Sequence, residues 1–176
     1  PLRLQELFTW RLKAPRVDLR VVQAAATIGP AFDADTVSAV VGDPALVAEQ
    51  LAVLTAEGVI EPGEQAARAY RFRHALMRDA AYETQVLDVR RLTHARVAEA
   101  LAAQRAEPAL IAKHLDLAGQ VAQAAAQYLV AGQAEQGHGA HVEATRLLSR
   151  AIELVESMSD SADRDLRELT ARMLRG

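Results

Sequence analysis

The period of the hydrophobic pattern along this chain changes within residues 69–82. Tyr70 and Phe72 alternate with arginines, which is the period-two pattern of a half-buried strand. From Leu76 onward the apolar residues recur at helical spacing, and His74 stands where the period changes. We therefore expect a small domain of helices and strands before His74 and packed helices after it.

Before His74 the pattern predicts four helices and a two-stranded ribbon. Helices are expected at residues 2–13, 19–27, 35–41 and 44–57, and strands at 59–60 and 70–73, with a polar turn at 62–65. The expected N-caps are Asp18, Asp35 and Asp43, and the expected helix ends are Gly42 and Gly58. The residues expected to face inward on helix 19–27 are Leu19, Val22 and Ala26. Apart from the first helix, this is the element order of a winged helix.

After His74 the pattern is helical to the end of the chain. Helices are expected at residues 76–86, 88–104, 108–119, 121–136, 142–157 and 163–174, with Asp88 capping the second. The helices 121–136 and 142–157 are similar to one tetratricopeptide unit, in which small residues let two helices approach closely. The residues that carry this similarity are Tyr128, Gly132, Ala144, Leu148 and Ala151. An unrelated helical bundle remains the alternative.

Composition limits the class of protein further. The 176 residues are 51% hydrophobic but only 4% aromatic, which favours close-packed helices, so the expected fold class is mainly α. Cysteine is absent, which excludes disulfides and thiolate metal sites. A net charge of −3 predicts no general attraction to nucleic acid or to an anionic membrane. The chain starts at Pro1 and shows no signal peptide or membrane-spanning run, so we expect a piece of a longer cytoplasmic protein.

Several short motifs, taken together and in this order, resemble the region behind the ATPase domain of bacterial STAND signal-transduction ATPases, which include cyclase-ATPase-repeat proteins and large LuxR-type regulators. They are Leu4-Gln-Glu-Leu7, Gln23-Ala-Ala-Ala-Thr-Ile-Gly29, Tyr70-Arg-Phe-Arg-His-Ala-Leu76, Asp79-Ala-Ala-Tyr82, Arg91-Leu-Thr-His94 and Ala112-Lys-His-Leu-Asp-Leu-Ala-Gly119. The resemblance implies a helix at residues 1–16 that links to an upstream nucleotide-binding domain. It implies a winged helix at 17–75 and a repeat-like helical array at 76–176.

The resemblance also implies a function without catalysis in this chain. In that family the winged helix packs on the nucleotide-binding domain, and the repeats sense a protein or small-molecule signal. ATP or ADP would be bound by the parent protein, which could be an ATPase, an adenylate or guanylate cyclase, or a transcriptional regulator. The phosphate-binding pattern G-x-x-x-x-G-K-[ST] does not occur here, so we expect neither ATP hydrolysis nor cyclic nucleotide synthesis from these residues.

The resemblance makes His74 a candidate contact to ADP in the parent. In related switch proteins a Met-His-Asp-Leu motif follows the wing, and its histidine contacts the bound diphosphate. Here Arg73-His-Ala-Leu76 matches at His74 and at Leu76, which is expected to anchor the helix, and lacks the aspartate. The alternative is a histidine that caps a helix or packs the junction.

A concentration of arginine around the wing and the next two helices is a candidate docking face for an acidic partner or for the nucleotide-binding domain. Its members are Arg68, Arg71, Arg73, Arg78, Arg90, Arg91 and Arg96. The alternative is an ordinary solvated surface.

Other histidines give no comparable signal. His138 and His141 have a spacing that could place two imidazoles on one metal, but a polar turn between helices explains them, and no metal site is expected. His94 and His114 lie among apolar neighbours and are expected in the core or an interface. No catalytic triad or paired carboxylates can be argued from spacing.

Two other functions stay open. A winged helix can read DNA through its third helix, but helix 44–57 carries Glu49 and Glu57 and no lysine or arginine, so no nucleic acid is expected as a partner. The chain could also be an oligomerisation scaffold, with weak self-association through Leu166, Leu169 and Met173 on the last predicted helix.

Overall fold

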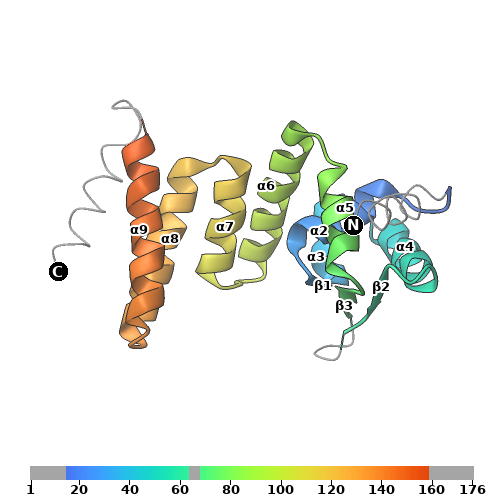
Figure 1. Ribbon diagram of the computed structural model, residues 1–176, viewed down its shortest axis with the longest axis horizontal. Helices are drawn as coiled ribbons and strands as arrows, with labels where there is room; N and C mark the ends of the chain where they lie inside the picture. Colours follow the sequence, from blue (N-terminus) through green and yellow to red (C-terminus); the bar gives the residue numbers. More distant parts are fainter. Residues whose placement is uncertain (1–14, 64–67, 159–176) are drawn as a thin grey trace. The chain divides into compact units, whose positions relative to one another are not determined.

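The computed structural model describes residues 15–63 and 68–158 and is mainly helical (Figure 1). The chain divides into two compact units, residues 1–100 and 101–176. The predicted helices at 2–13 and 163–174 and part of the turn at 62–65 lie outside the described residues. The predicted domain division after residue 75 stays a prediction.

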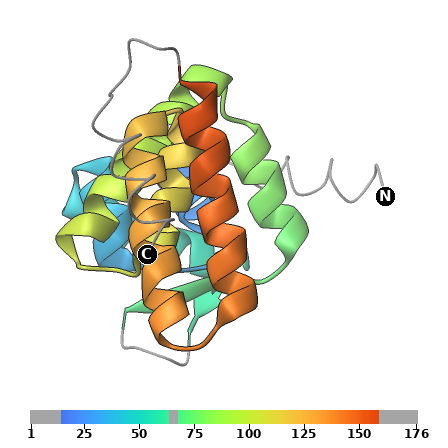
Figure 2. The same ribbon diagram turned by 90° about the vertical axis from the view of Figure 1, so that its left-hand side faces the viewer.

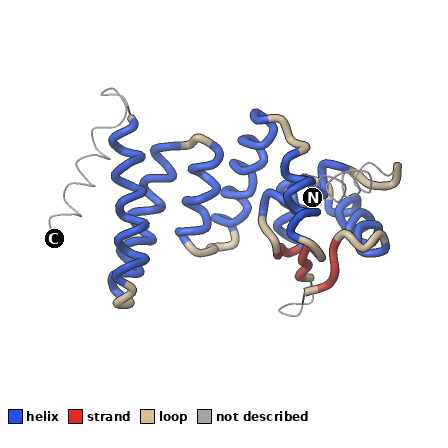
Figure 3. The backbone as a smooth tube through the Cα atoms, in the orientation of Figure 1, coloured by secondary structure: helices blue, strands red, loops and turns tan. Residues whose placement is uncertain are grey.

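The first unit contains three short helices, a small sheet, one further helix and most of another. Its elements are α2 (Leu19–Ile28), β1 (Ala31–Asp33), α3 (Ala34–Val41), α4 (Pro44–Ala56), β2 (Ile60–Pro62), β3 (Ala69–Phe72), α5 (Ala75–Glu83) and most of α6 (Leu87–Ala103). Figure 3 shows the strands, in red, beside these helices. The predicted helices at 19–27, 35–41 and 44–57 are confirmed to within one residue or so at each end.

Aspartate side chains begin all three short helices. Asp18 accepts a hydrogen bond from the amide of Arg20 at 2.8 Å, and Asp43 accepts one from Leu46 at 3.0 Å. The prediction of Asp35 as the cap of α3 is wrong, because Asp33 accepts from the amide of Thr36 at 2.7 Å. Asp33 ends a strand in extended backbone, as an N-cap requires, whereas Asp35 already lies in the first helical turn.

The sheet has three strands in the order β1-β3-β2, and both pairings are antiparallel. The predicted ribbon is confirmed as β2 and β3, with Ile60 opposite Phe72. The sequence prediction missed β1, which pairs with β3 on its other edge. Only Phe32 of this three-residue strand is buried, and its ring lies 5.6 Å from that of Phe72. A single buried residue is too short a pattern to reveal a strand from sequence.

The core of the first unit is aliphatic and forms where the helices cover the sheet. Its fully buried large side chains are Val21, Val22, Val37, Val47, Leu54, Val59, Ile60 and Val97. The prediction that Leu19 faces inward is wrong, since its side chain is exposed beside the helix start while Val21 and Val22 fill the core. The prediction that Leu76 anchors α5 is wrong in the same way, because α5 begins at Ala75 and buries Met77 and Ala81.

The junction between α5 and α6 also differs from the prediction. Helix α5 ends at Glu83 rather than at residue 86. Asp88 is not the cap of α6, because the helix begins at Leu87 and Asp88 lies in its first turn. A carboxylate there still favours the helix through its interaction with the amino-terminal dipole.

The second unit consists of the end of α6 and of α7 (Pro108–Ala118), α8 (Val121–Gly137) and α9 (His141–Ser157). Helices α8 and α9 lie side by side along their lengths (Figures 1 and 2). At their closest approach, a Cβ atom added to Gly132 would lie 2.7 Å from Cγ of Leu148. The expected close packing of these two helices through small residues is thus present.

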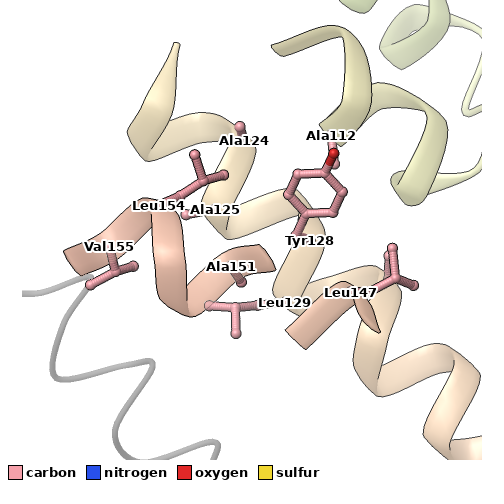
Figure 4. Packing of buried hydrophobic residues seen from close by; sticks show 10 residues of the cluster. Ala112, Ala124, Ala125, Tyr128, Leu129, Leu147, Ala151, Leu154 and Val155 are labelled. Atoms are coloured by element: carbon pink, nitrogen blue, oxygen red, sulfur yellow. The ribbon is translucent and has the colours of Figure 1, made fainter. Parts of the chain in front are cut away.

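Tyr128 is the largest side chain in the core of the second unit. Figure 4 shows its ring directed from α8 toward Ala112 on α7, and the hydroxyl reaches the edge of the cluster. Leu129, Leu147 and Ala151 fill the space between α8 and α9. Helix α8 therefore packs on α7 through one side and on α9 through another.

Candidate functional site

His74 lies at the strand-to-helix transition that the sequence predicts. It occupies the N-cap position of α5 with extended backbone, φ −136° and ψ 133°. Its carbonyl oxygen accepts from the amide of Met77 at 3.0 Å, so the backbone is held on both sides. The imidazole is exposed and makes no capping hydrogen bond to the helix. This placement leaves the ring accessible to a partner or ligand.

Three of the seven arginines of the candidate docking face lie on or beside the sheet, and each forms an ion pair. Arg68 lies 2.5 Å from a carboxylate oxygen of Asp35. Arg71 and Arg73 share the carboxylate of Glu61, at 2.7 and 3.2 Å. The arginines and Asp35 are well exposed and Glu61 is partly exposed, so each pair contributes little stability, about 0–1 kcal/mol. Their positive charge is largely neutralised locally.

Two further arginines are engaged at the junction of α5 and α6. Arg78 pairs with the neighbouring Asp79. The guanidinium of Arg90 lies 4.3 Å from the centre of the Tyr82 ring and donates to the carbonyl oxygens of Tyr82 and Gln85. Arg90 therefore binds one carbonyl in the last turn of α5 and one just after the helix ends. It holds the junction together rather than presenting charge to a partner.

Arg91 and Arg96 are the members of the set that stay exposed without an ion pair in the described part of the chain. Both are on α6. Arg96 also lines a shallow pocket of about 420 Å³ together with Glu99 and residues 39–42 at the end of α3. The structure thus spreads the predicted arginine set over two places and leaves charge available mainly on α6.

A polar network that sequence reasoning missed joins α5 to α2 and α6. The hydroxyl of Tyr82 and Nε2 of His94 share a hydrogen bond of 2.8 Å, and His94 is buried as predicted. Gln85 donates to Oγ1 of Thr27 at 3.0 Å, and Gln23 donates to Oγ1 of Thr84 at 2.9 Å. These partners are 12 to 61 residues apart, and no local pattern marks them.

Two buried polar atoms of this junction have no hydrogen-bond partner within the described residues: Oε1 of Gln85 and Nε of Arg90. A buried group left in this state costs on the order of 1–3 kcal/mol. The α5–α6 junction is therefore less stable than its many contacts alone would make it.

A second missed cluster joins α7 to α9 in the second unit. The guanidinium of Arg150 donates to both carboxylate oxygens of Asp116, at 2.8 and 3.0 Å, and to Glu153 at 2.8 Å. These carboxylates raise the pKa of Arg150. Burial, and next to it the negative charge of Asp116, raises the pKa of Tyr128. The bidentate pair fixes the position of α9 relative to α7.

The histidines of the second unit are not part of this cluster. His114 is buried, as predicted for a core or interface residue. His138 and His141 are exposed at the turn between α8 and α9. Nowhere in the part of the chain that the structure describes do three histidine, aspartate or glutamate side chains gather as metal ligands. None of the described helices has both the length and the apolar character needed to cross a membrane.

Comparison with known proteins identifies neither a family nor a fold for this chain. Neither a family model nor a solved structure matches the chain. A stretch of 108 residues, 58% of the chain, is 31% identical to the uncharacterized protein R02095 of Rhizobium meliloti strain 1021. The matched stretch covers 10% of that protein, so the chain spans about a tenth of the length of this relative. The relative carries no stated activity.

Proposed function

We propose that this chain is a non-catalytic regulatory and interaction region of a signal-transduction ATPase. In this proposal residues 17–75 form a winged helix that couples the nucleotide state of an upstream domain to a tetratricopeptide-like scaffold. The observation that carries the first part is the element order α2-β1-α3-α4-β2-β3 with β3 in the middle of the sheet. Helices in this order, with a strand after the first and a terminal two-stranded wing, are the arrangement of a winged helix.

The packing of α8 and α9 supports the second part. Gly132 lets the backbones of the two helices approach, with Leu148 against it and Ala144 and Ala151 buried nearby. Tyr128 precedes Gly132 by one helical turn, as the aromatic of a tetratricopeptide unit does. Repeats of this kind present surfaces for other proteins rather than catalytic groups.

The relative from Rhizobium meliloti supports the view that these residues are one module of a larger protein. Its matched segment makes up 10% of its length, so the relative contains this stretch within a much longer chain. The upstream nucleotide-binding domain and its ATP or ADP are part of this proposal. The search that tests it most directly is for a phosphate-binding loop encoded upstream of Pro1.

The surface of α4 favours coupling over DNA reading. In a DNA-binding winged helix this element would enter the major groove. Its exposed positions are Pro44, Ala45, Ala48, Glu49, Ala52 and Ala56. No cation on this face can neutralise a phosphate, and neutralisation supplies most of the non-specific affinity of DNA-binding proteins. A small apolar surface of this kind fits against another protein domain.

We accordingly expect no measurable binding of this chain to duplex DNA at physiological salt. The measurement is a fluorescence-anisotropy titration of a labelled duplex, repeated at low and high salt. Salt-sensitive, sub-micromolar binding would favour the DNA-reading alternative and count against the coupling role.

A substitution of His74 in the full-length parent protein tests the proposal. If the imidazole contacts the bound diphosphate, His74→Ala should weaken ADP retention roughly tenfold, since a hydrogen bond to a charged group contributes about 1.5–3 kcal/mol. Basal output should rise, because the ADP-bound state is the resting one in this proposal. The melting temperature of the present chain should hardly change, because the ring is exposed.

The control for this experiment is His138→Ala, which removes an equally exposed histidine from the turn after α8. It should leave ADP retention unchanged. Equal retention in the His74 variant and the wild type, or a large loss of stability in the isolated chain, would assign His74 a purely structural role.

A further inference from the structure

Helix α6 exposes an unusual amount of apolar surface over its first two turns. Val86, just before the helix, is 67% exposed, and Leu92 is 54% exposed. Leu87 and Val89 between them are also exposed. Single exposed leucines are ordinary, but four large apolar side chains within seven residues form a patch of the kind that marks an interaction surface.

Charges of opposite sign flank Leu92, within this stretch, at equal distances. Asp88, Leu92 and Arg96 are spaced by four residues, so they form one row along the helix surface. Both charged side chains are exposed, and neither takes part in an ion pair within residues 15–63 and 68–158. The row therefore reads negative, apolar, positive from one end to the other.

A pocket lies at the positive end of the row. Its walls are residues 39–42 at the end of α3 and Arg96, Glu99 and Ala100 of α6. Its volume is about 420 Å³, which is large enough for an aliphatic side chain. The α3 side of the pocket is lined by alanine, valine and glycine, so an apolar group fits there.

We propose that a second copy of this chain packs antiparallel on α6, about a two-fold axis at Leu92. In such a pairing each residue faces the one equally far on the other side of Leu92. Asp88 then meets Arg96 of the second copy, and Arg96 meets its Asp88. Because Arg96 lines the pocket, the pocket borders this contact in both copies. Every contact occurs twice, as two-fold symmetry requires.

The self-complementarity of the row is what selects a second copy over a foreign partner. An acidic protein would be repelled by Asp88 and Glu99, and a basic one by Arg91 and Arg96. A copy of the same helix, run in the opposite direction, matches both signs at once and places the two exposed Leu92 side chains together on the axis. This inference concerns α6 alone and stands whether or not the proposed function holds.

One helix and one pocket form a small interface, so the association should be weak. Interfaces below roughly 1,200 Å² belong to weak or transient complexes. We expect a monomer–dimer equilibrium in sedimentation of the 176-residue chain over concentrations from about 1 μM to about 1 mM.

The test reverses the charge at residue 88 in one variant and at residue 96 in a second variant. Asp88→Arg alone places two arginines opposite each other at both contacts, and Arg96→Asp alone places two aspartates there. Each variant alone should dimerise about tenfold more weakly or not at all. An equimolar mixture of the two variants should restore association, because each arginine at 88 then faces an aspartate at 96. Leu92→Glu should abolish association, with circular dichroism confirming that every variant is folded.

The matched control is Leu169→Glu, on the terminal segment that the sequence marks as the rival contact. It should leave association unchanged. A wild-type chain that stays monomeric over the whole range, single variants that associate like the wild type, or a mixture that stays monomeric would each overturn the proposal. Loss of association in the Leu169 variant would overturn it too and assign the contact to that segment.

Discussion

Replacing Gly132 with valine is expected to destabilise the second unit by about 1–3 kcal/mol, the usual cost of forcing extra atoms into a packed core. The first added carbon would lie 2.7 Å from Cγ and 2.8 Å from Cδ2 of Leu148, far closer than van der Waals contact. The carbonyl oxygen of Ala144 at 3.4 Å prevents an easy shift of α9. The strain should exceed the gain in helix propensity from removing a glycine, which is under 1 kcal/mol.

Gly137 provides the matched control for this substitution. It is the last residue of the same helix, and an added Cβ there would meet nothing within 4 Å. Gly137→Val should be nearly neutral in urea denaturation followed by circular dichroism, whereas Gly132→Val should show a clearly lower midpoint. Adding Leu148→Ala to the Gly132 variant should recover part of the loss, because neighbours in contact are energetically coupled. Equal midpoints for the two valine variants would contradict the close approach of α8 and α9.

Helix caps and helix-ending residues made much of this fold predictable from the sequence. Asp18 and Asp43 act as caps, Gly42 ends α3 with φ 81°, and Pro108 and Gly119 bound α7. Each of these signals acts within a few residues, through a side-chain hydrogen bond or a backbone preference. The mistaken cap at Asp35 had the same origin, since two aspartates stand close together and only the unseen strand β1 decides between them.

Features that depend on pairing over long distances could not be read in the same way. Strand β1 exists because Ala31 lies opposite Arg71, forty residues later. The arginine face was predicted from the number of arginines in this part of the sequence. The register of the sheet, however, decides which of these arginines are neutralised by a carboxylate and which keep an unpaired charge. Because Glu61 lies opposite Arg71, its carboxylate takes up two arginines of that set. Once the ribbon register is known, this neutralisation follows directly.

The position of the candidate residue His74 could be predicted from the sequence, because it depends on a change in the period of the hydrophobic pattern. It does not depend on a contact between residues distant in sequence. The network around Tyr82 was not, because it joins three helices through side chains that carry no motif. Tyr82 and His94 are 12 residues apart on consecutive helices, and their meeting depends on how the loop at 84–86 turns.

Tyr82 is expected to be a main determinant of the stability of the first unit. Tyr82→Phe keeps the ring beneath Arg90 but leaves Nε2 of the buried His94 without the hydroxyl, which should cost about 1–3 kcal/mol. Tyr82→Ala also removes the cation–π contact and the edge-to-face contact with His94, and should cost about 3 kcal/mol or more. Thermal unfolding monitored by circular dichroism measures both.

The comparison residue is Tyr70 of β3, whose ring stacks on Phe32 with centres 6.0 Å apart. Its hydroxyl makes no hydrogen bond within the described residues, so Tyr70→Phe should change the free energy of unfolding by less than about 0.5 kcal/mol. The two Tyr→Phe changes remove the same atom from the same unit and differ only in what that atom contacts. If both variants melt together with the wild type, the Tyr82–His94 hydrogen bond does not stabilise the α5–α6 junction. If the Tyr82 variant has a lower melting temperature, this bond stabilises the packing of α6 against α5. The exposed row of α6 then lies on a helix that is held firmly within the first unit.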